Sequence, residues 1–204
     1  MHLSASREDE SLSDFAQPRC SDAGFPPKVA STGESDTGIL GDPDWFVVYT
    51  TSRHEKRVAQ HFQAREVQYF LPVYCAERRW NDGSRVRLEL PLFPCYVFVR
   101  TNRKERTRVL QTPGVLSFVA GTGGEPAVFP ENLIESLRQE LPRRRAEPHA
   151  LPLHGMKARI RSGPFTGMEG IVVRTKGGYR AVLTLDSIKQ SFAVEVSIEE
   201  LELF

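Results

Sequence analysis

The stretch PLFPCYVFV (Pro91–Val99) carries apolar residues on both faces when it is read as one β-strand. A strand with a solvent-facing side shows polar residues on that side. Both faces must therefore be covered, and the second covering comes either from the rest of this chain or from another molecule. The two faces consist of Phe93, Cys95, Val97 and Val99 on one side, and of Pro94, Tyr96 and Phe98 on the other.

The segments around this stretch alternate between predicted strands and helices. WFVVYT (45–50) reads as a strand, and Ser52 with Glu55 forms an S-x-x-E capping box that predicts a helix start. The sequence NDGS (81–84) predicts a hairpin turn, and Pro130 predicts the start of a second amphipathic helix. An embedded hairpin argues against a wholly parallel sheet. We therefore expect residues 44–141 to form an α+β domain with a mostly antiparallel sheet flanked by helices.

The remaining chain divides into three further segments. Residues 1–43 are rich in Ser, Asp, Glu, Gly and Pro, which predicts a disordered tail. Residues 142–154 hold three prolines and a charge run, which predicts a linker in which Arg143–Arg145 are solvated. Residues 155–204 contain five short β-rich runs separated by glycines, which predicts a small all-β barrel.

Charge and composition exclude several classes of function. Residues 1–44 carry three Lys/Arg and nine Asp/Glu (3 − 9 = −6), whereas residues 45–204 carry 24 and 17 (24 − 17 = +7). The three cysteines form no CxxC pair, and we expect reduced thiols in a cytoplasmic protein without a signal peptide or a membrane span. No phosphate loop, metal-ligand spacing or nucleophile with an oriented base appears. We therefore expect neither an enzyme nor a bound cofactor or metal.

The C-terminal motif KARIRSGPFTGMEGIVV resembles the KOW motif of ribosomal proteins and transcription elongation factors. Gly163 and Gly170 are expected to supply positive φ or a close backbone approach there. The ordered series WFVVYT, HEKRVAQHF, FLP, LFPCYVFV and TPGVLSFVAGTGGEPAVFP resembles the NGN domain of the NusG family. The motifs RHEK, FLP and RRW are similar to the specialised UpxY, LoaP and RfaH-type paralogues. The resemblance implies an NGN domain followed by an SH3-like KOW barrel.

The same resemblance implies how the chain contacts RNA polymerase. The family docks an apolar patch of the NGN sheet on the β′ clamp helices, and the corresponding positions here are Phe93, Tyr96 and Phe98. Pro94 is expected to bend the chain so that Phe93 can join the other two. A second contact, with the β gate loop, corresponds to residues 105–107, whose side chains differ from those of the family.

Two further sites follow from the resemblance. Arg53, Arg57 and His61 recur at i, i+4 spacing, which fits either contact with the displaced non-template DNA strand or a solvated helix face. In the KOW domain, an exposed loop tip is expected to bind NusE, the ribosomal protein, or Rho. The residues expected at this tip are Ile188, Lys189 and Gln190.

These features together predict a monomeric transcription elongation and antitermination factor. It would bind RNA polymerase through the NGN domain and recruit a second partner through the KOW domain. The alternatives are a general NusG-type factor that couples to Rho or to the ribosome, and a KOW-type RNA-binding protein. The glycines between residues 155 and 178 disfavour a helix. We therefore expect the KOW domain to stay a β-barrel, unlike the helical hairpin known in the RfaH member of the family.

Overall fold

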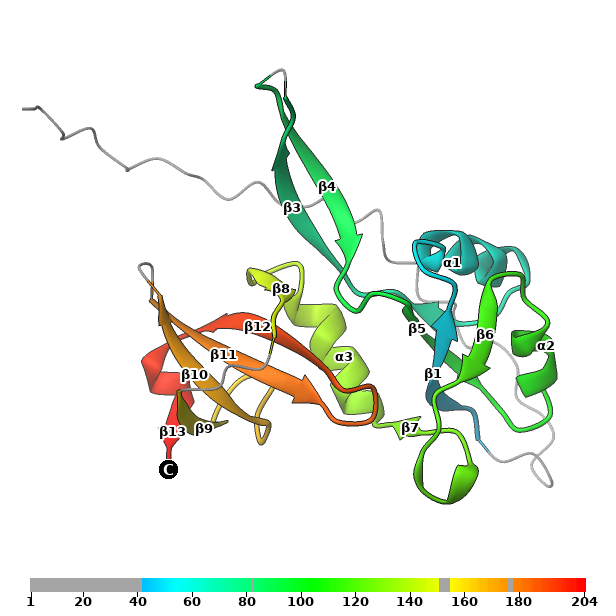
Figure 1. The fold of residues 1–204 in the computed structure, drawn as a ribbon. Coiled ribbons are helices and arrows are strands. Elements are labelled where there is room, and N and C mark those ends of the chain that lie inside the picture. The colour runs from blue at the N-terminus through cyan, green and yellow to red at the C-terminus, as the bar shows by residue number, and fades with distance from the viewer. Residues whose placement is uncertain (1–41, 82, 151–154, 176–177) are drawn as a thin grey trace, which may run out of the picture.

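The computed structural model describes residues 42–81, 83–150, 155–175 and 178–204, and these residues form two β-rich domains that lie side by side (Figure 1). The tail expected at residues 1–43 lies outside the described residues, except for its last two positions. Among the described residues, no helix is long and apolar enough to cross a membrane.

The N-terminal domain is built on an antiparallel sheet. Its strands follow the order β2-β5-β1-β6, and β7 also pairs with β1. The expected α+β domain with a mostly antiparallel sheet is therefore confirmed. The strands are β1 (Asp44–Thr50), β2 (Tyr69–Phe70), β5 (Tyr96–Thr101), β6 (Val115–Phe118) and β7 (Val128–Phe129).

Alternating apolar residues in β1 divide this sheet between two cores. Phe46 and Val48 point to the side that holds Val58 and Phe62, so helix α1 (Glu55–Ala64) covers this face. The short helix α2 (Arg106–Leu110) adds Val109 to the same core. Trp45 and Val47 alternate with these residues and therefore point to the opposite face, as does Phe98 of β5.

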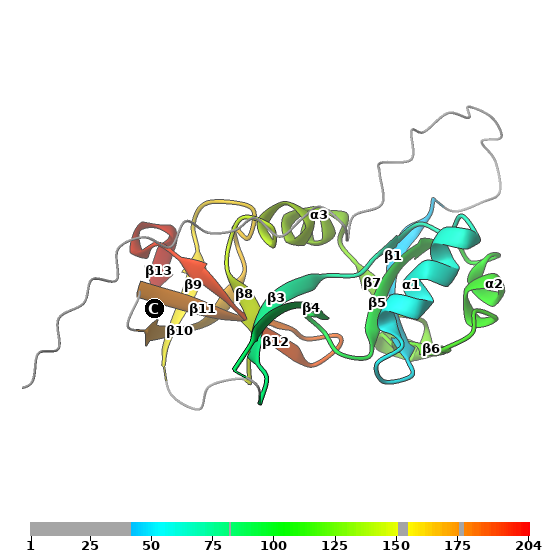
Figure 2. The ribbon, with the colours of Figure 1, turned by 90° about the horizontal axis from the view of Figure 1, so that it is seen from above.

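The opposite face meets helix α3 (Glu131–Glu140), which follows the short 3-10 turn η1 (Thr122–Gly124) and β7. Ile134 and Leu137 of α3 join the core of that face, and the Arg138 guanidinium stacks over the Trp45 ring, 5.7 Å from its centroid. Figure 2 shows α3 beside the C-terminal strands, on the side that faces the N-terminal sheet.

The strands β3 (Val73–Arg79) and β4 (Arg85–Pro91) form a hairpin that pairs with no other strand of the described part of the chain. This hairpin extends away from both domains (Figure 1). The predicted hairpin is confirmed, since β3 and β4 pair antiparallel and the Trp80 N–H donates to the Ser84 carbonyl, while residue 82 of the predicted turn lies outside the described residues.

The C-terminal domain is a six-stranded antiparallel sheet in the order β13-β9-β10-β11-β12-β8. Five of these strands are the five predicted runs, and β8 comes from within the segment expected to be a linker. The only helical turn among residues 155–175 and 178–204 is the 3-10 turn η2 (Ile198–Glu200), so this domain is a β-structure and not a helical hairpin. The strands are β8 (Ala146–Pro148), β9 (Met156–Ile160), β10 (Glu169–Thr175), β11 (Gly178–Leu185), β12 (Gln190–Val196) and β13 (Leu201–Leu203).

The expectation of reduced thiols is wrong for one cysteine. Cys75 is disulfide-bonded, whereas Cys95 is a free thiol.

Candidate functional site

The stretch Pro91–Val99 is not one strand, because a turn separates its two halves. Strand β4 ends at Pro91 and β5 begins at Tyr96. Between them, the Tyr96 N–H donates to the Phe93 carbonyl at 3.2 Å, and Cys95 adopts a φ of 68°. This turn breaks the strand alternation and lets Phe93 share a core with Phe98, as the bend expected at Pro94 requires.

A buried carboxylate holds this turn in place. Glu55 accepts a hydrogen bond from the Cys95 N–H at 2.7 Å, and the Thr50 N–H donates to the Cys95 carbonyl at 2.8 Å. The predicted capping box is therefore wrong: His54 is the N-cap of α1 without a side-chain cap, and Glu55 instead bonds the turn before β5.

The three residues expected to dock on polymerase lie on one face of the sheet, which we call the aromatic face. The rings of Phe93 and Phe98 lie 6.1 Å apart, and Tyr96 packs against their cluster while it remains partly exposed. Tyr49 of β1 extends this face, with its ring 5.5 Å from that of Tyr96. Burial raises the pKa of the Tyr96 phenol, so Tyr96 is neutral at pH 7 and presents a hydroxyl and a ring rather than a charge.

The C-terminal barrel covers the part of the aromatic face around Phe93. Phe192 of β12 packs edge-on against Phe93 at 5.6 Å, and Phe165 packs against Phe192 at 6.0 Å. Phe93 is only 1% exposed, and Phe98 is fully buried among Phe70, Phe93 and Phe129 of its own domain. The second apolar side of Pro91–Val99 is therefore covered by this chain's own barrel together with α3.

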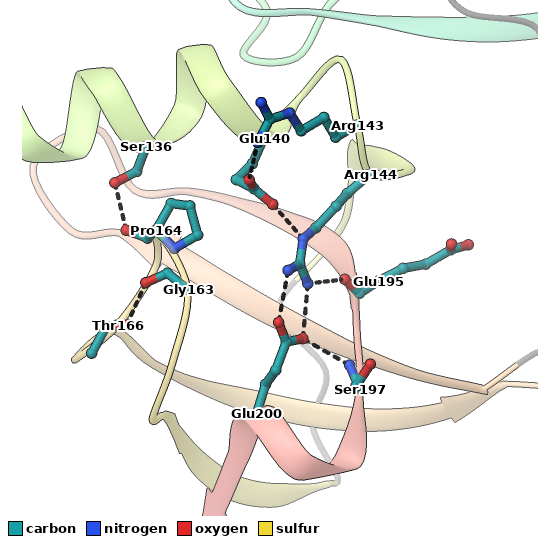
Figure 3. Close-up of polar contacts among 10 residues, drawn as sticks. All are labelled: Ser136, Glu140, Arg143, Arg144, Gly163, Pro164, Thr166, Glu195, Ser197 and Glu200. Atoms are coloured by element: carbon teal, nitrogen blue, oxygen red, sulfur yellow. Dashed lines mark hydrogen bonds and ion pairs between the residues drawn. The ribbon is translucent and has the colours of Figure 1, made fainter.

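An arginine just beyond α3 joins the helix to the barrel (Figure 3). The Arg144 guanidinium donates two parallel hydrogen bonds to the Glu200 carboxylate, at 2.7 and 2.8 Å. Its Nε also donates to Glu140 of α3, and its Nη1 donates to the Glu195 carbonyl of β12. We call Arg144, Glu140 and Glu200 the arginine clamp.

The hydrogen bonds of the arginine clamp shift the pKa values of its members. The hydrogen bonds to Glu200 raise the pKa of Arg144, and the same bonds lower the pKa of the Glu200 carboxyl. Nearby, the Ser136 hydroxyl of α3 contacts the Pro164 carbonyl of the barrel. Sequence reasoning missed this site, because it treated Arg143–Arg145 as a solvated run. The i, i+4 spacing of Glu140 and Arg144 was the available signal.

The residues expected to contact DNA are only partly brought together. Arg57 and His61 lie one turn apart on α1. Arg53 precedes the helix with a φ of 62°, so the expected three-residue stripe on one helix is wrong at this position. All three side chains are at least partly accessible to solvent.

The expected partner-binding tip of the barrel also differs from the prediction. Ile188 is only 4% exposed and belongs to the apolar core, so its expected exposure is wrong. Lys189 is exposed at a φ of 52°, and Gln190 begins β12 in a half-buried position. The Ile188 N–H donates to the Leu185 carbonyl in a local turn, and this turn places the Ile188 side chain in the core.

Residues 105–107 lie at the start of α2. Arg106 stacks on the Phe46 ring at 4.7 Å and pairs with Glu125 at 3.0 Å. Glu105 and Thr107 are exposed. Among the described residues, no group of three or more His, Cys, Asp or Glu side chains could hold a metal ion.

Comparison with known proteins places this architecture in a class. Residues 43–138 match the family model described as "Transcription termination factor nusG". The transcription termination/antitermination protein NusG of Staphylococcus carnosus (strain TM300) is 27% identical over 177 residues, which span 80% of this chain and 97% of that protein. NusG of Staphylococcus aureus (strain Mu50) is 28% identical over the same length.

A solved structure described as "Domain interaction in Thermotoga maritima NusG" has the same fold. It superposes with a TM-score of 0.51 and 21% identity, covering 78% of this chain and 96% of that one. The two-domain fold is that of the solved NusG structure. The chain is similar to transcription termination/antitermination proteins of the NusG type over 80% of its length, and residues 43–138 match the NusG family model.

Proposed function

We propose that this chain is an elongation and antitermination factor that docks on the β′ clamp helices of RNA polymerase through the aromatic face. The observation that carries the proposal is the convergence of Phe93, Tyr96 and Phe98 in one apolar cluster. An apolar groove on a sheet can accept an amphipathic helix through such side chains. The protein would act by binding the elongating state of polymerase in the cytoplasm, not by catalysis.

Docking would require the barrel to leave the aromatic face. Phe93 contacts Phe192 directly, so a helix and the barrel cannot occupy this position together. Tyr96 and Tyr49 remain accessible at the edge of the face and could make the first contact. Polymerase would then compete with the barrel, and the apparent affinity would fall with the fraction of molecules that are open.

Two secondary contacts belong to the same proposal. Arg57 and His61 on α1 would contact the non-template DNA strand, with Arg53 nearby in the preceding turn. On the barrel, Lys189 and Gln190 would contribute to binding NusE or Rho, and Ile188 would support their loop from inside. A general NusG role that couples polymerase to Rho or to the ribosome uses the same surfaces and is the alternative.

Competition between the barrel and clamp helices tests the docking proposal. A peptide hairpin of the β′ clamp helices is titrated into the full chain, into Tyr96→Ala and into the control Tyr96→Phe. We expect Tyr96→Phe to bind like the unchanged protein, because it keeps the ring, and Tyr96→Ala to bind at least about tenfold more weakly, as expected for a hot-spot aromatic.

Circular dichroism verifies that each variant remains folded. Equal affinity of folded Tyr96→Ala and the unchanged chain would show that the aromatic face is not the docking site. Transcription assays on pausing and termination templates, with and without Rho, then separate the specialised factor from the general one.

A further inference from the structure

The β3–β4 hairpin presents a basic, aromatic surface that the proposed polymerase contact does not use. Residues 78–87 contain four arginines and one aspartate in sequence (4 − 1 = +3). The side chains of Arg78, Arg79 and Arg85 are exposed and form no hydrogen bond or ion pair with any residue that the structure describes. The Arg87 side chain pairs with the exposed Glu77, at 3.4 Å.

The register of the hairpin places like charges together. Arg79 lies directly opposite Arg85, a cross-strand arrangement that destabilises an isolated hairpin. Two residues along each strand, Glu77 and Arg87 lie opposite each other on the same face. An anion bound between these two side chains would offset their mutual repulsion.

The opposite face of the hairpin is both basic and apolar. Arg78 lies across from Val86, and Trp80 shares this face two residues further on. Trp80 is 59% exposed, and Val86 is exposed beside it. Both faces therefore carry positive charge, and the end of the hairpin also carries an exposed aromatic ring.

The shape of the hairpin indicates which kind of nucleic acid it fits best. It is a two-stranded ribbon that extends away from both domains (Figure 1), and no other strand among the described residues pairs with it. The major groove of B-form DNA, about 12 Å wide, admits a two-stranded ribbon and has phosphates along both walls. The major groove of an RNA duplex is too deep and narrow for side chains to read. A single strand would bring phosphates to only one side at a time.

We propose that the β3–β4 hairpin inserts into the major groove of duplex DNA. Arg79 and Arg85 would face one phosphate wall and Arg78 the other, while Trp80 at the end of the hairpin would make apolar contacts with base edges such as the thymine methyl group. This surface lies on a different element from Arg57 and His61 and does not depend on docking through the aromatic face.

The salt dependence of binding to three probes tests the proposal. The full chain is titrated with a 20-base-pair DNA duplex, an RNA duplex of the same sequence and the single DNA strand. We expect the DNA duplex to bind most tightly. Changing Arg79→Ala together with Arg85→Ala should reduce the slope of log K against log salt for this duplex by about 1.8, since each lost phosphate contact removes about 0.9.

A matched control removes the same charge elsewhere. Arg103→Ala together with Arg159→Ala deletes two exposed arginines outside the hairpin, one before α2 and one on β9. We expect this control to leave the slope unchanged. An equal loss of slope in both double variants would show that only net charge matters and would overturn the proposal. Equal or tighter binding of the RNA duplex or of the single strand would also overturn it.

The tryptophans supply a measurement that needs no variant. The chain has two, of which Trp45 is 2% exposed and Trp80 is 59% exposed, so acrylamide quenching reports mainly on Trp80. Saturation with the DNA duplex should lower the quenching constant of the unchanged protein. Unchanged quenching at saturation would mean that the hairpin stays outside the groove.

Discussion

At the scale of single residues, one carboxylate determines the shape of the aromatic face. Glu55 is buried at the start of α1, and it accepts a hydrogen bond from the N–H of Cys95, which lies in the left-handed region. This turn brings Phe93 into the same core as Phe98. The Glu55 hydrogen bond therefore helps to position Phe93, although Glu55 is not part of the aromatic face.

Replacing Glu55 should therefore destabilise the turn. In Glu55→Ala, the Cys95 N–H loses its acceptor, and we expect a loss of about 1–3 kcal/mol in the free energy of unfolding. Glu55→Gln keeps an acceptor oxygen and serves as the control, with a smaller loss. Urea denaturation measures both, and equal losses in the two variants would contradict the role of the acceptor.

A glycine in the barrel is constrained by space. The predicted positive φ is found at Gly163, at 89°, whereas Gly170 is the position of close approach. A Cβ placed on Gly170 would lie 2.5 Å from the Val182 carbonyl oxygen of the neighbouring strand.

Gly170→Ala should consequently strain the pairing of β10 with β11. We expect a loss of about 1–3 kcal/mol, the usual cost of overpacking. Gly123→Ala, at a φ of 75° with open space around the Cβ, is a useful comparison, because it tests backbone strain without a steric clash. Thermal unfolding compares the two, and a Gly170→Ala protein as stable as the unchanged chain would show that the strands can separate freely.

At the scale of elements, the arginine clamp joins α3 to η2 of the barrel. Arg144 lies between Glu140 and Glu200, and it also reaches the Glu195 carbonyl (Figure 3). Its bidentate pairing with Glu200 is the geometry in which charge-assisted hydrogen bonds are strongest. The clamp is partly shielded from solvent, so salt should screen it less than a fully exposed ion pair.

Acid should weaken this clamp. The hydrogen bonds from Arg144 lower the folded-state pKa of Glu200, so its contribution is present at neutral pH and is lost as the pH falls below the ordinary range of a glutamate carboxyl and through that lowered pKa. Glu200→Gln removes the charge and should lose about 1–2 kcal/mol of interdomain stability at pH 7. Nitrogen-15 relaxation measures whether the two domains tumble together. If acid loosens the contact between the domains as much in Glu200→Gln as in the unchanged chain, other carboxyl groups cause the effect.

At the scale of the whole molecule, the proposed docking would make the barrel and polymerase compete for one face. The barrel covers Phe93 through Phe192, and α3 together with the arginine clamp holds the two domains against each other. The proposed docking would therefore draw on a minor open state, and every contact between the domains would lower the apparent affinity for polymerase.

Weakening the clamp should strengthen docking. Arg144→Gln breaks the bonds to Glu140 and Glu200 and leaves the aromatic face unchanged. Each 1.4 kcal/mol lost from the closed state should raise the affinity for clamp helices about tenfold, until the open state predominates. Titration of the clamp-helix hairpin measures the change, with Arg143→Gln as the control, since the Arg143 side chain is mostly exposed. Weaker binding by Arg144→Gln would show that the closed arrangement favours docking.

Much of the fold could be predicted because its signals are local. Strand alternation, the hairpin signal at residues 81–84 and the glycine pattern of the barrel each act over a few residues, and the structure agrees with all three. The candidate docking residues were found through the family motif, although Phe93 required a bend that strand periodicity alone does not provide.

Other features depended on contacts between distant parts of the chain. The sequence indicated that Pro91–Val99 needed a covering on both sides, but only the tertiary structure decided that the barrel supplies one of them through Phe192. In the same way, Glu55 bonds the Cys95 N–H and not the start of its own helix, and the Ile188 side chain is buried where exposure was expected. Periodicity fixes which side chains share a face, whereas the partner of that face depends on how the two domains pack together, and no local pattern encodes that contact.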